Sequence, residues 1–271
     1  MTVPPTRTVD PVDLLVLAVE AGEAAAAFLM EGLHRERTLV ATKSSATDMV
    51  TEMDQRSEAM IVDHLLAARP ADGLLGEEGA SKSGTSGIVW VIDPLDGTTN
   101  YLYGHPGFSV SIAAVAGDVT LAGVVVDPVH GETYTATTGG GSRVNGRPLT
   151  GPRPGGLPEA LVGTGFSYDP ARRARQGQVV AAMLAQIRDL RRGGGAAVDL
   201  CLVAQGRLDA YYERGLAPWD LAAGCLIAQE AGAIVGDFDG GIAGPHGALA
   251  AHPDLFDLLA ERLRAAGAAD A

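Results

Sequence analysis

The sequence predicts a mixed α/β fold built in layers. Its first half joins helix-patterned segments to a run of short β-prone segments, and its second half alternates strand-like with helix-like segments. Such alternation is typical of proteins in which helices cover the faces of a sheet. The chain has 271 residues, 46% of them hydrophobic, so it is long enough to bury a large core.

Two helices are predicted at the N-terminal end. Residues 11–32 open with Pro11 and carry alanine and leucine at helical spacing, and residues 53–68 return to that spacing. The polar segment between them predicts a loop or a loose hairpin. The apolar face of the second helix is predicted to consist of Met60, Ile61, His64 and Leu65.

A sheet is predicted next. Residues 87–93, GIVWVID, form a β-rich run, and residues 108–142 contain short β-prone runs separated by turns, which predicts an antiparallel meander. The glycines of TTGGGSR lie inside this pattern and predict a tight turn. Pro and Gly cluster in residues 151–159. We therefore expect residues 1–150, with the helices and the antiparallel sheet, and residues 151–271 to be two halves of one compact unit.

Beyond that boundary the two periodicities alternate, which predicts layered α/β structure. The expected elements are strand 160–166, helix 171–186, strand 187–191, helix 195–206, strand 208–213, helix 218–231, strands 233–236 and 247–251, and helix 253–265.

Charge and terminal composition restrict the class of protein. Lys and Arg total 20 and Asp and Glu total 33, so the net charge is −13. This charge repels phosphate backbones, so we expect no nucleic-acid or anionic-membrane partner, and an anionic small substrate would need cations in its site. Cys201 and Cys225 lie in apolar helical segments without C-x-x-C spacing, which favours buried thiols in a reducing compartment. With no signal-peptide pattern and no membrane-length apolar run, we expect a cytoplasmic protein.

Acidic residues gather in four short segments between the predicted elements. Each segment alone has an ordinary explanation as a helix cap, a solvated loop or a turn. Together they indicate a divalent-cation site, because clustered carboxylates stay ionised when cations offset their repulsion. The segments are TDMVTEMD with Asp48 and Asp54, GEEG with Glu77 and Glu78, DPLDGTT with Asp93 and Asp96, and PWDLAAG with Asp220.

The chemistry of these acids favours phosphoryl transfer. Mg²⁺ takes hard oxygen ligands and keeps water and substrate phosphate in its shell. Two such ions about 3.5–4 Å apart can hold the attacking and leaving oxygens of an in-line displacement. Gly97 lets a phosphate approach the backbone, and Thr98 and Thr99 can begin a helix whose free N–H groups face an anion.

The motifs resemble those of the inositol monophosphatase family of Mg²⁺-dependent, lithium-sensitive phosphatases. That family is known for D-P-[IL]-D-G-T and W-D-x-A-A-G, which read DPLDGT at 93–98 and WDLAAG at 219–224 here. GEE at 76–78 and KSSATDMVTEMD at 43–54 match in kind and order, and the resemblance spans about residues 11–265. It implies an α-β-α-β-α sandwich of the sugar phosphatase type, usually paired as a homodimer.

The resemblance also implies ligands for two or three Mg²⁺ ions. Glu77, Asp93 and the carbonyl of Leu95 would hold the first ion. Asp93, Asp96 and Asp220 would hold the second, and a third, weaker ion would lie near Glu77.

The catalytic roles follow from the same resemblance. Thr98, paired with Asp54, would orient a metal-activated water, with Glu77 close by. The N–H groups of Gly97 and Thr98 would hold the phosphate.

The resemblance also implies a pocket for the polyol. The family positions that line it correspond to Asp96, Gly194, Gly195, Ala196 and Glu213. From residues alone, RRGGGAAVD also reads as a flexible turn into a helix, and Lys43 reads as a phosphate neighbour or a loop residue.

The implied activity is hydrolysis of inositol monophosphate to inositol and inorganic phosphate. DGTTNY resembles the inositol branch, whereas the branches that act on nucleotides and on histidinol phosphate more often carry lysine at Thr99. The alternatives are the same chemistry on histidinol phosphate, fructose 1,6-bisphosphate or 3′-phosphoadenosine 5′-phosphate, and a non-catalytic metal-binding scaffold.

Overall fold

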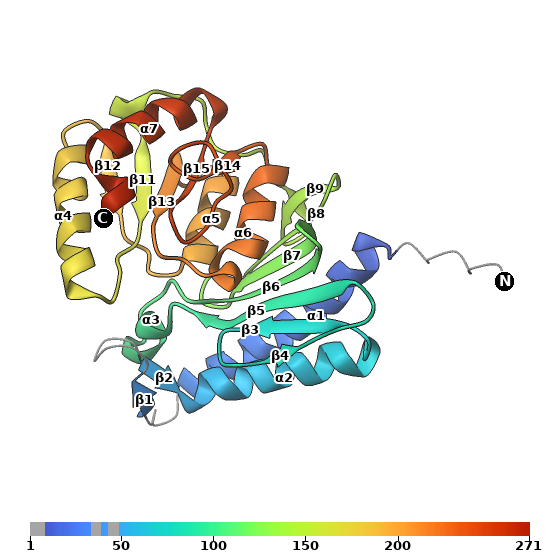
Figure 1. The fold of residues 1–271 in the computed structure, drawn as a ribbon. Coiled ribbons are helices and arrows are strands. Elements are labelled where there is room, and N and C mark those ends of the chain that lie inside the picture. The colour runs from blue at the N-terminus through green and yellow to red at the C-terminus, as the bar shows by residue number, and fades with distance from the viewer. Residues whose placement is uncertain (1–8, 34–38, 43–48) are drawn as a thin grey trace.

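A computed structural model of the chain describes residues 9–33, 39–42 and 49–271 (Figure 1). Lys43 and Asp48 lie outside the described residues. The short strands β1 (Leu39–Thr42) and β2 (Met49–Thr51) pair antiparallel, in agreement with the expected hairpin.

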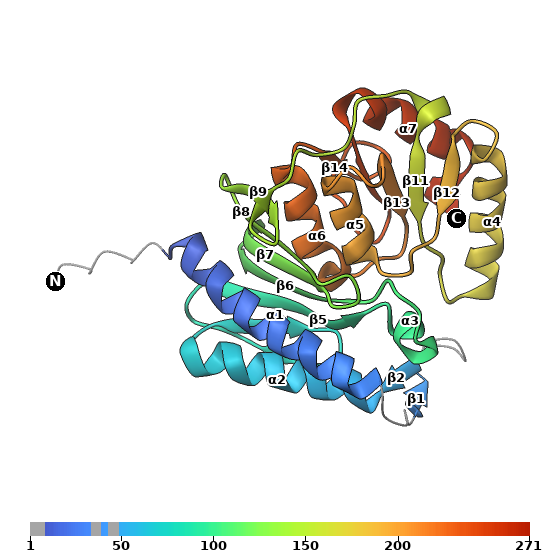
Figure 2. The ribbon, with the colours of Figure 1, turned by 180° about the vertical axis from the view of Figure 1, so that it is seen from behind.

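The outermost layer consists of α1 (Pro11–Leu33) and α2 (Glu52–Ala68), which lie along one face of an eight-stranded sheet (Figure 2). The strand order is β10-β9-β8-β7-β6-β5-β3-β4, and β3 and β5 are its parallel pair. The strands are β3 (Gly73–Gly76), β4 (Ser81–Lys82), β5 (Ile88–Asp96), β6 (Ser109–Ala116), β7 (Val119–Asp127), β8 (Glu132–Thr137), β9 (Gly141–Val144) and β10 (Arg147–Pro148).

The remaining layers belong to the second half of the chain. Helices α5 (Ala196–Ala204) and α6 (Pro218–Glu230) lie between the eight-stranded sheet and a five-stranded sheet of order β12-β11-β13-β15-β14 (Figure 1). Helices α4 (Pro170–Met183) and α7 (Pro253–Ala265) cover the outer face of that second sheet. Its strands are β11 (Leu161–Thr164), β12 (Asp189–Arg191), β13 (Ala210–Glu213), β14 (Ile234–Gly236) and β15 (Ala248–Ala251).

Four apolar clusters fill the spaces between these five layers. One joins α1 and α2 to the eight-stranded sheet around Trp90, and a second joins that sheet to α5 and α6 around Ala223. A third lies between α5, α6 and the second sheet around Leu200, and the fourth lies under α4 and α7 around Leu259. The predicted α-β-α-β-α sandwich is confirmed.

Several local expectations need correction. Residues 93–96 continue β5 to Asp96 instead of forming a turn, and β3 was not assigned from sequence. The short helix α3 (Thr98–Tyr103) begins at Thr98, where a helix start was expected. On α2, Met60 is 40% exposed and His64 is exposed, whereas Ile61 and Leu65 are buried. The buried stripe continues toward the start of α2 through polar residues, which an apolar pattern cannot reveal. Those residues are Asp54, Ser57 and Glu58.

Gly224 of α6 lies where this helix packs closely against Leu200 of α5. A Cβ at Gly224 would lie 2.8 Å from Leu200 Cδ1 and 3.0 Å from its Cβ. Gly224→Ala is therefore expected to destabilise the protein by about 1–3 kcal/mol through overpacking, although alanine is the better helix former. Chemical denaturation measures this free energy.

A matched control lies in α4. A Cβ at Gly177, also inside a helix, would meet no atom within 4 Å. Gly177→Ala is expected to stabilise the protein by up to about 1 kcal/mol. Equal effects of the two substitutions would contradict the packing explanation.

Candidate active site

The end of β5 carries two acids of the expected site. Pro94 lacks an N–H, and the pairing of β5 with β6 is irregular between Asp93 and Asp96. Within this interval the Leu95 N–H donates to Asp93 Oδ1 at 3.0 Å. Asp93 and Asp96 are both buried, with 1% and 7% exposure. The irregular strand end therefore fixes two carboxylates three residues apart.

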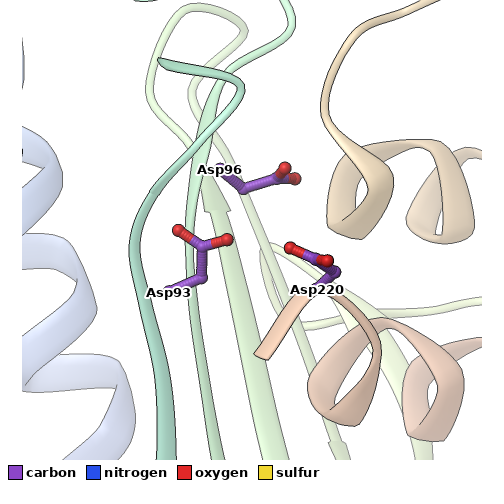
Figure 3. Close-up of side chains that lie close together, drawn as sticks. All are labelled: Asp93, Asp96 and Asp220. Atoms are coloured by element: carbon purple, nitrogen blue, oxygen red, sulfur yellow. The ribbon is translucent and has the colours of Figure 1, made fainter. Parts of the chain in front are cut away.

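The third acid comes from the start of α6. Asp220 Oδ2 accepts the N–H of Ala217 at 2.6 Å, and Ser111 of β6 donates to the carbonyl of Trp219 at 3.3 Å. The first bond caps the start of α6, and the second attaches that helix start to β6, an inner strand of the first sheet. One ligand oxygen from each of Asp93, Asp96 and Asp220 lies within 4.8 Å of the other two, and the three side chains lie close together (Figure 3).

The start of α5 holds Asp96 in place. The Ala196 and Ala197 N–H groups donate to Asp96 Oδ1 and Oδ2 at 3.2 and 2.9 Å. A Cβ at Gly195 would lie 2.8 Å from Asp96 Oδ2, so a side chain there would meet the carboxylate. Helix N-termini favour negative charge, and Asp96 receives this stabilisation.

The acids raise one another's pKa. Burial is the largest cause for Asp93, followed by the charges of Glu77 and Asp96, and the pKa of Asp93 is well above its usual range. Burial and then Asp220 raise the pKa of Asp96 in the same way. A cluster of hard oxygen donors with this much repulsion fits a divalent cation such as Mg²⁺, whose charge would reverse the shift.

Thr98 lies beside the acids and has two acceptors. Its Oγ1 is 3.1 Å from the Leu95 carbonyl and 3.3 Å from Asp54 Oδ2, and it donates to either. Asp54 is fully buried on α2. Gly97 immediately precedes Thr98 with φ of 85°, and its Cβ would lie 2.7 Å from the Gly107 carbonyl, so glycine is required there.

Glu77 follows the end of β3, next to β5. Its N–H donates to the Ile92 carbonyl at 3.1 Å, and its charge acts on Asp93. Among the described residues, the tight carboxylate group contains the other three acids but not Glu77. The structure thus brings together the expected second ligand set, and Glu77 lines the same cavity outside this tight group.

A cavity of about 450 Å³ opens over the acids. The expected residues Gly97, Thr98, Gly194, Ala196 and Glu213 line it, whereas Gly195 and Asp54 support it from behind. Sequence reasoning required cations for an anionic substrate but did not identify them. The cations of this wall are Arg172, Arg192 and Arg214.

Glu213, partly buried on the cavity wall, and the buried Asp199 of α5 form a second acid pair. Burial raises the pKa of Glu213 to about 7, and burial together with the charge of Glu213 raises the pKa of Asp199 to about 7. Arg192 lowers both, and Tyr211 donates its hydroxyl proton to Glu213 Oε2. Asp199 was not identified from sequence because a single acid inside an apolar helix carries no motif.

The chain belongs to the inositol monophosphatase family. The model of that family matches residues 10–268. An inositol-1-monophosphatase from Mycobacterium leprae is 42% identical over 83% of this chain and 81% of its own length.

Two further relatives carry other names. A Nus factor SuhB from Xylella fastidiosa is 42% identical, with 83% of this chain and 82% of that protein covered. The crystal structure of an extragenic suppressor protein suhB from Bartonella henselae superposes with a TM-score of 0.88 at 32% identity, covering 93% of this chain and 98% of that one.

Both cysteines are free thiols, Cys201 buried and Cys225 partly buried. Within the described residues, no helix has the length and apolar character needed to cross a membrane.

The raised pKa of Asp199 predicts a pH-dependent stability. Its carboxyl binds a proton more tightly in the folded state than in the unfolded chain. The folded state therefore loses this stabilisation as pH rises from about 4, the unfolded pKa, to about 7. In the absence of divalent cations, the melting temperature of Asp199→Asn is expected to fall less between pH 5 and pH 8 than that of the wild type.

Asparagine can still accept the Gly193 N–H that Asp199 accepts, so the comparison isolates the charge. Parallel melting curves for the two proteins across this pH range would contradict the assignment.

Proposed function

We propose that this chain is a Mg²⁺-dependent phosphomonoesterase that hydrolyses inositol monophosphate to inositol and inorganic phosphate. The observation that carries the proposal is the convergence of Asp93, Asp96 and Asp220 beside the Thr98–Asp54 pair, at the floor of one cavity. Family membership supports the same reaction.

The metal ligands are proposed as two sets that share Asp93. Asp93, Asp96 and Asp220 would hold one ion, and Glu77, Asp93 and the Leu95 carbonyl another, with a third ion near Glu77. All of these donors are oxygens, which suits Mg²⁺. When bound, Mg²⁺ offsets the charge of the carboxylates, lowers the pKa of water and stabilises negative charge on phosphoryl oxygens.

Thr98 and Asp54 are proposed to manage the proton of the attacking water. While the Thr98 hydroxyl donates to Asp54 Oδ2, its oxygen lone pairs can accept a proton from a water on the cavity side. This geometry orients one lone pair of the water toward the phosphorus and lets the proton pass toward the buried carboxylate. Glu77 lines the same cavity and is proposed to assist.

Backbone N–H groups of Gly97 and Thr98 are proposed to hold phosphate oxygens, with both residues lining the cavity. For the alcohol, Glu213 and Asp96 are proposed to accept hydrogen bonds from hydroxyls, with Gly194 and Ala196 beside the ring. Gly195 is proposed to let α5 approach Asp96. The guanidinium groups on the cavity wall reduce the repulsion that an anionic substrate meets in a chain of charge −13.

Other small phosphate esters are the alternative substrates, and they share the same chemistry. Thr99 Oγ1 lies 3.5 Å from the Tyr168 hydroxyl at the rim, where a lysine would change the charge presented to substrate. A homodimer, lithium sensitivity and a cytoplasmic location are proposed from the family. Although one relative is named a Nus factor, we propose no nucleic-acid partner because the net charge is −13.

Phosphate release tests the proposal directly. Purified protein with Mg²⁺ is expected to release inorganic phosphate from inositol 1-phosphate faster than from histidinol phosphate, fructose 1,6-bisphosphate or 3′-phosphoadenosine 5′-phosphate. Chelation of Mg²⁺ should abolish release and readdition should restore it. Absence of release from every ester with Mg²⁺ present would refute the enzymatic function.

Removing the shared ligand tests the metal assignment. Asp93→Asn is expected to lower kcat by more than about 100-fold, because loss of an outer-sphere partner alone costs about 10–100-fold. Its melting temperature without metal should not fall, because the change removes a buried charge with a raised pKa. Asp63→Asn, on the exposed side of α2, is the control and should leave kcat unchanged.

A further inference from the structure

The buried face of α2 contacts three separate parts of the proposed site. Asp54 accepts from Thr98, Ser57 Oγ donates to the Pro94 carbonyl at 3.0 Å, and Glu58 contacts the turn after β3. These residues follow the i, i+3, i+4 spacing that places side chains on one side of a helix. Ser57 is fully buried and Glu58 is 6% exposed, so this face is interior.

Glu58 uses both carboxylate oxygens on backbone N–H groups. Oε2 accepts the Glu78 N–H at 2.9 Å and Oε1 accepts the Ala80 N–H at 2.8 Å. Hydrogen bonds from a carboxylate to N–H groups are charge-assisted and stronger than neutral ones. The pair of bonds therefore fixes the turn that carries Glu77.

The backbone of Glu77 is held on both sides by this arrangement. Its own N–H donates to the Ile92 carbonyl, one residue before Asp93, and the next N–H, that of Glu78, donates to Glu58. At the other end, the Gly76 N–H donates to the Ala80 carbonyl at 2.7 Å. The turn cannot shift Glu77 along β5 without breaking one of these hydrogen bonds.

Gly76 shows how closely the carboxylate approaches the turn. A Cβ at this position would overlap Glu58 Oε2 and lie 3.0 Å from the Ala80 Cβ. The φ of Gly76 is not in the left-handed region, so alanine is excluded by the carboxylate and not by backbone strain. The glycine of the GEE segment is therefore explained by a residue on α2.

We propose that Glu58 is a positioning residue that sets the distance between Glu77 and Asp93, and so the metal affinity of the proposed site. The inference rests on the proposed function, in which Glu77 and Asp93 share an ion. Glu58 is not among the residues that line the cavity over the acids, and both of its oxygens accept N–H groups of the turn, so it acts on the ion through that turn. Its negative charge, together with the N–H bonds, stabilises the one backbone conformation that aims Glu77 at Asp93.

The main test replaces Glu58 by glutamine, which keeps the shape but places an NH₂ group against one backbone N–H. Glu58→Gln is expected to weaken Mg²⁺ binding by about 10-fold or more in a calorimetric titration without substrate. Over a range of inositol 1-phosphate concentrations at fixed Mg²⁺, kcat is expected to fall by about 10–100-fold while KM is unchanged, because the loss concerns the transition state.

A matched control exists on α6. Glu230 also accepts two backbone N–H bonds from a glycine-containing turn, those of Gly139 and Gly141 at 2.7 and 2.9 Å, but this turn joins β8 to β9. Glu230→Gln should alter thermal stability without changing Mg²⁺ affinity or kcat. If Glu58→Gln matches Glu230→Gln in Mg²⁺ affinity and kcat, the positioning inference is overturned.

A second variant changes Gly76, the other partner of the contact, and so tests the proposal even if Glu58→Gln does not fold. Gly76→Ala should displace the carboxylate and reproduce the weaker Mg²⁺ binding. In the double variant Gly76→Ala with Glu58→Ala the clash is gone, so Mg²⁺ affinity should be no lower than in Glu58→Ala alone. Additive losses would overturn the inference.

The outcomes separate the two proposals. If the wild type binds Mg²⁺ and releases phosphate but Glu58 and Gly76 variants behave like the control, only the positioning inference fails. If the wild type binds Mg²⁺ but cleaves no ester, the proposed function fails while the effect on Mg²⁺ affinity still decides the role of Glu58. If the wild type binds no Mg²⁺, both are overturned.

Discussion

Mutual repulsion among buried carboxylates is the constraint on which the rest of the structure depends. Asp93, Asp96 and Asp220 present oxygens within 4.8 Å of one another, and the charge of Glu77 also raises the pKa of Asp93. Burial and repulsion together raise the pKa values of Asp93 and Asp96, so the cluster is unfavourable without a compensating cation. The fold therefore holds these carboxylates close together against their repulsion. Packing elsewhere in the protein supplies the free energy that offsets this repulsion.

The layered architecture provides that support from several directions. The end of β5 supplies two acids, the start of α6 supplies the third, and the start of α5 places two N–H groups on Asp96. Helices α5 and α6 are packed between two sheets, so neither can move away from the acids without opening an apolar cluster. On the opposite face of the first sheet, α2 fixes the Thr98 and Glu77 segments through buried polar contacts. The site is thus held by the middle layer from one side and by the outer layer from the other.

The sequence was informative where a motif concentrates several roles in a short segment. DPLDGT placed Asp93, Asp96, Gly97 and Thr98 in one stretch, and WDLAAG added Asp220, so the family and the acids that converge were predictable. The sequence was less informative where a residue acts on a segment that is distant in the chain. Glu58 contacts the turn after β3, 20 residues away at Glu78, and Asp199 of α5 interacts electrostatically with Glu213 of β13. On α2 the hydrophobic periodicity found the buried Ile61 and Leu65 but also included the exposed Met60 and His64, and it missed the polar residues with which the buried stripe begins.

The sequence by itself determined the α/β class, the order of most helices and strands, and the acids available for a cation, because periodicity and residue chemistry are local properties. Only the tertiary structure decided that three of these acids meet within 4.8 Å, that Gly195 faces Asp96, and that Gly76 faces Glu58. These relations depend on the spacing between layers, which is set by side-chain packing summed over whole helices and sheets. No short stretch of sequence determines this packing.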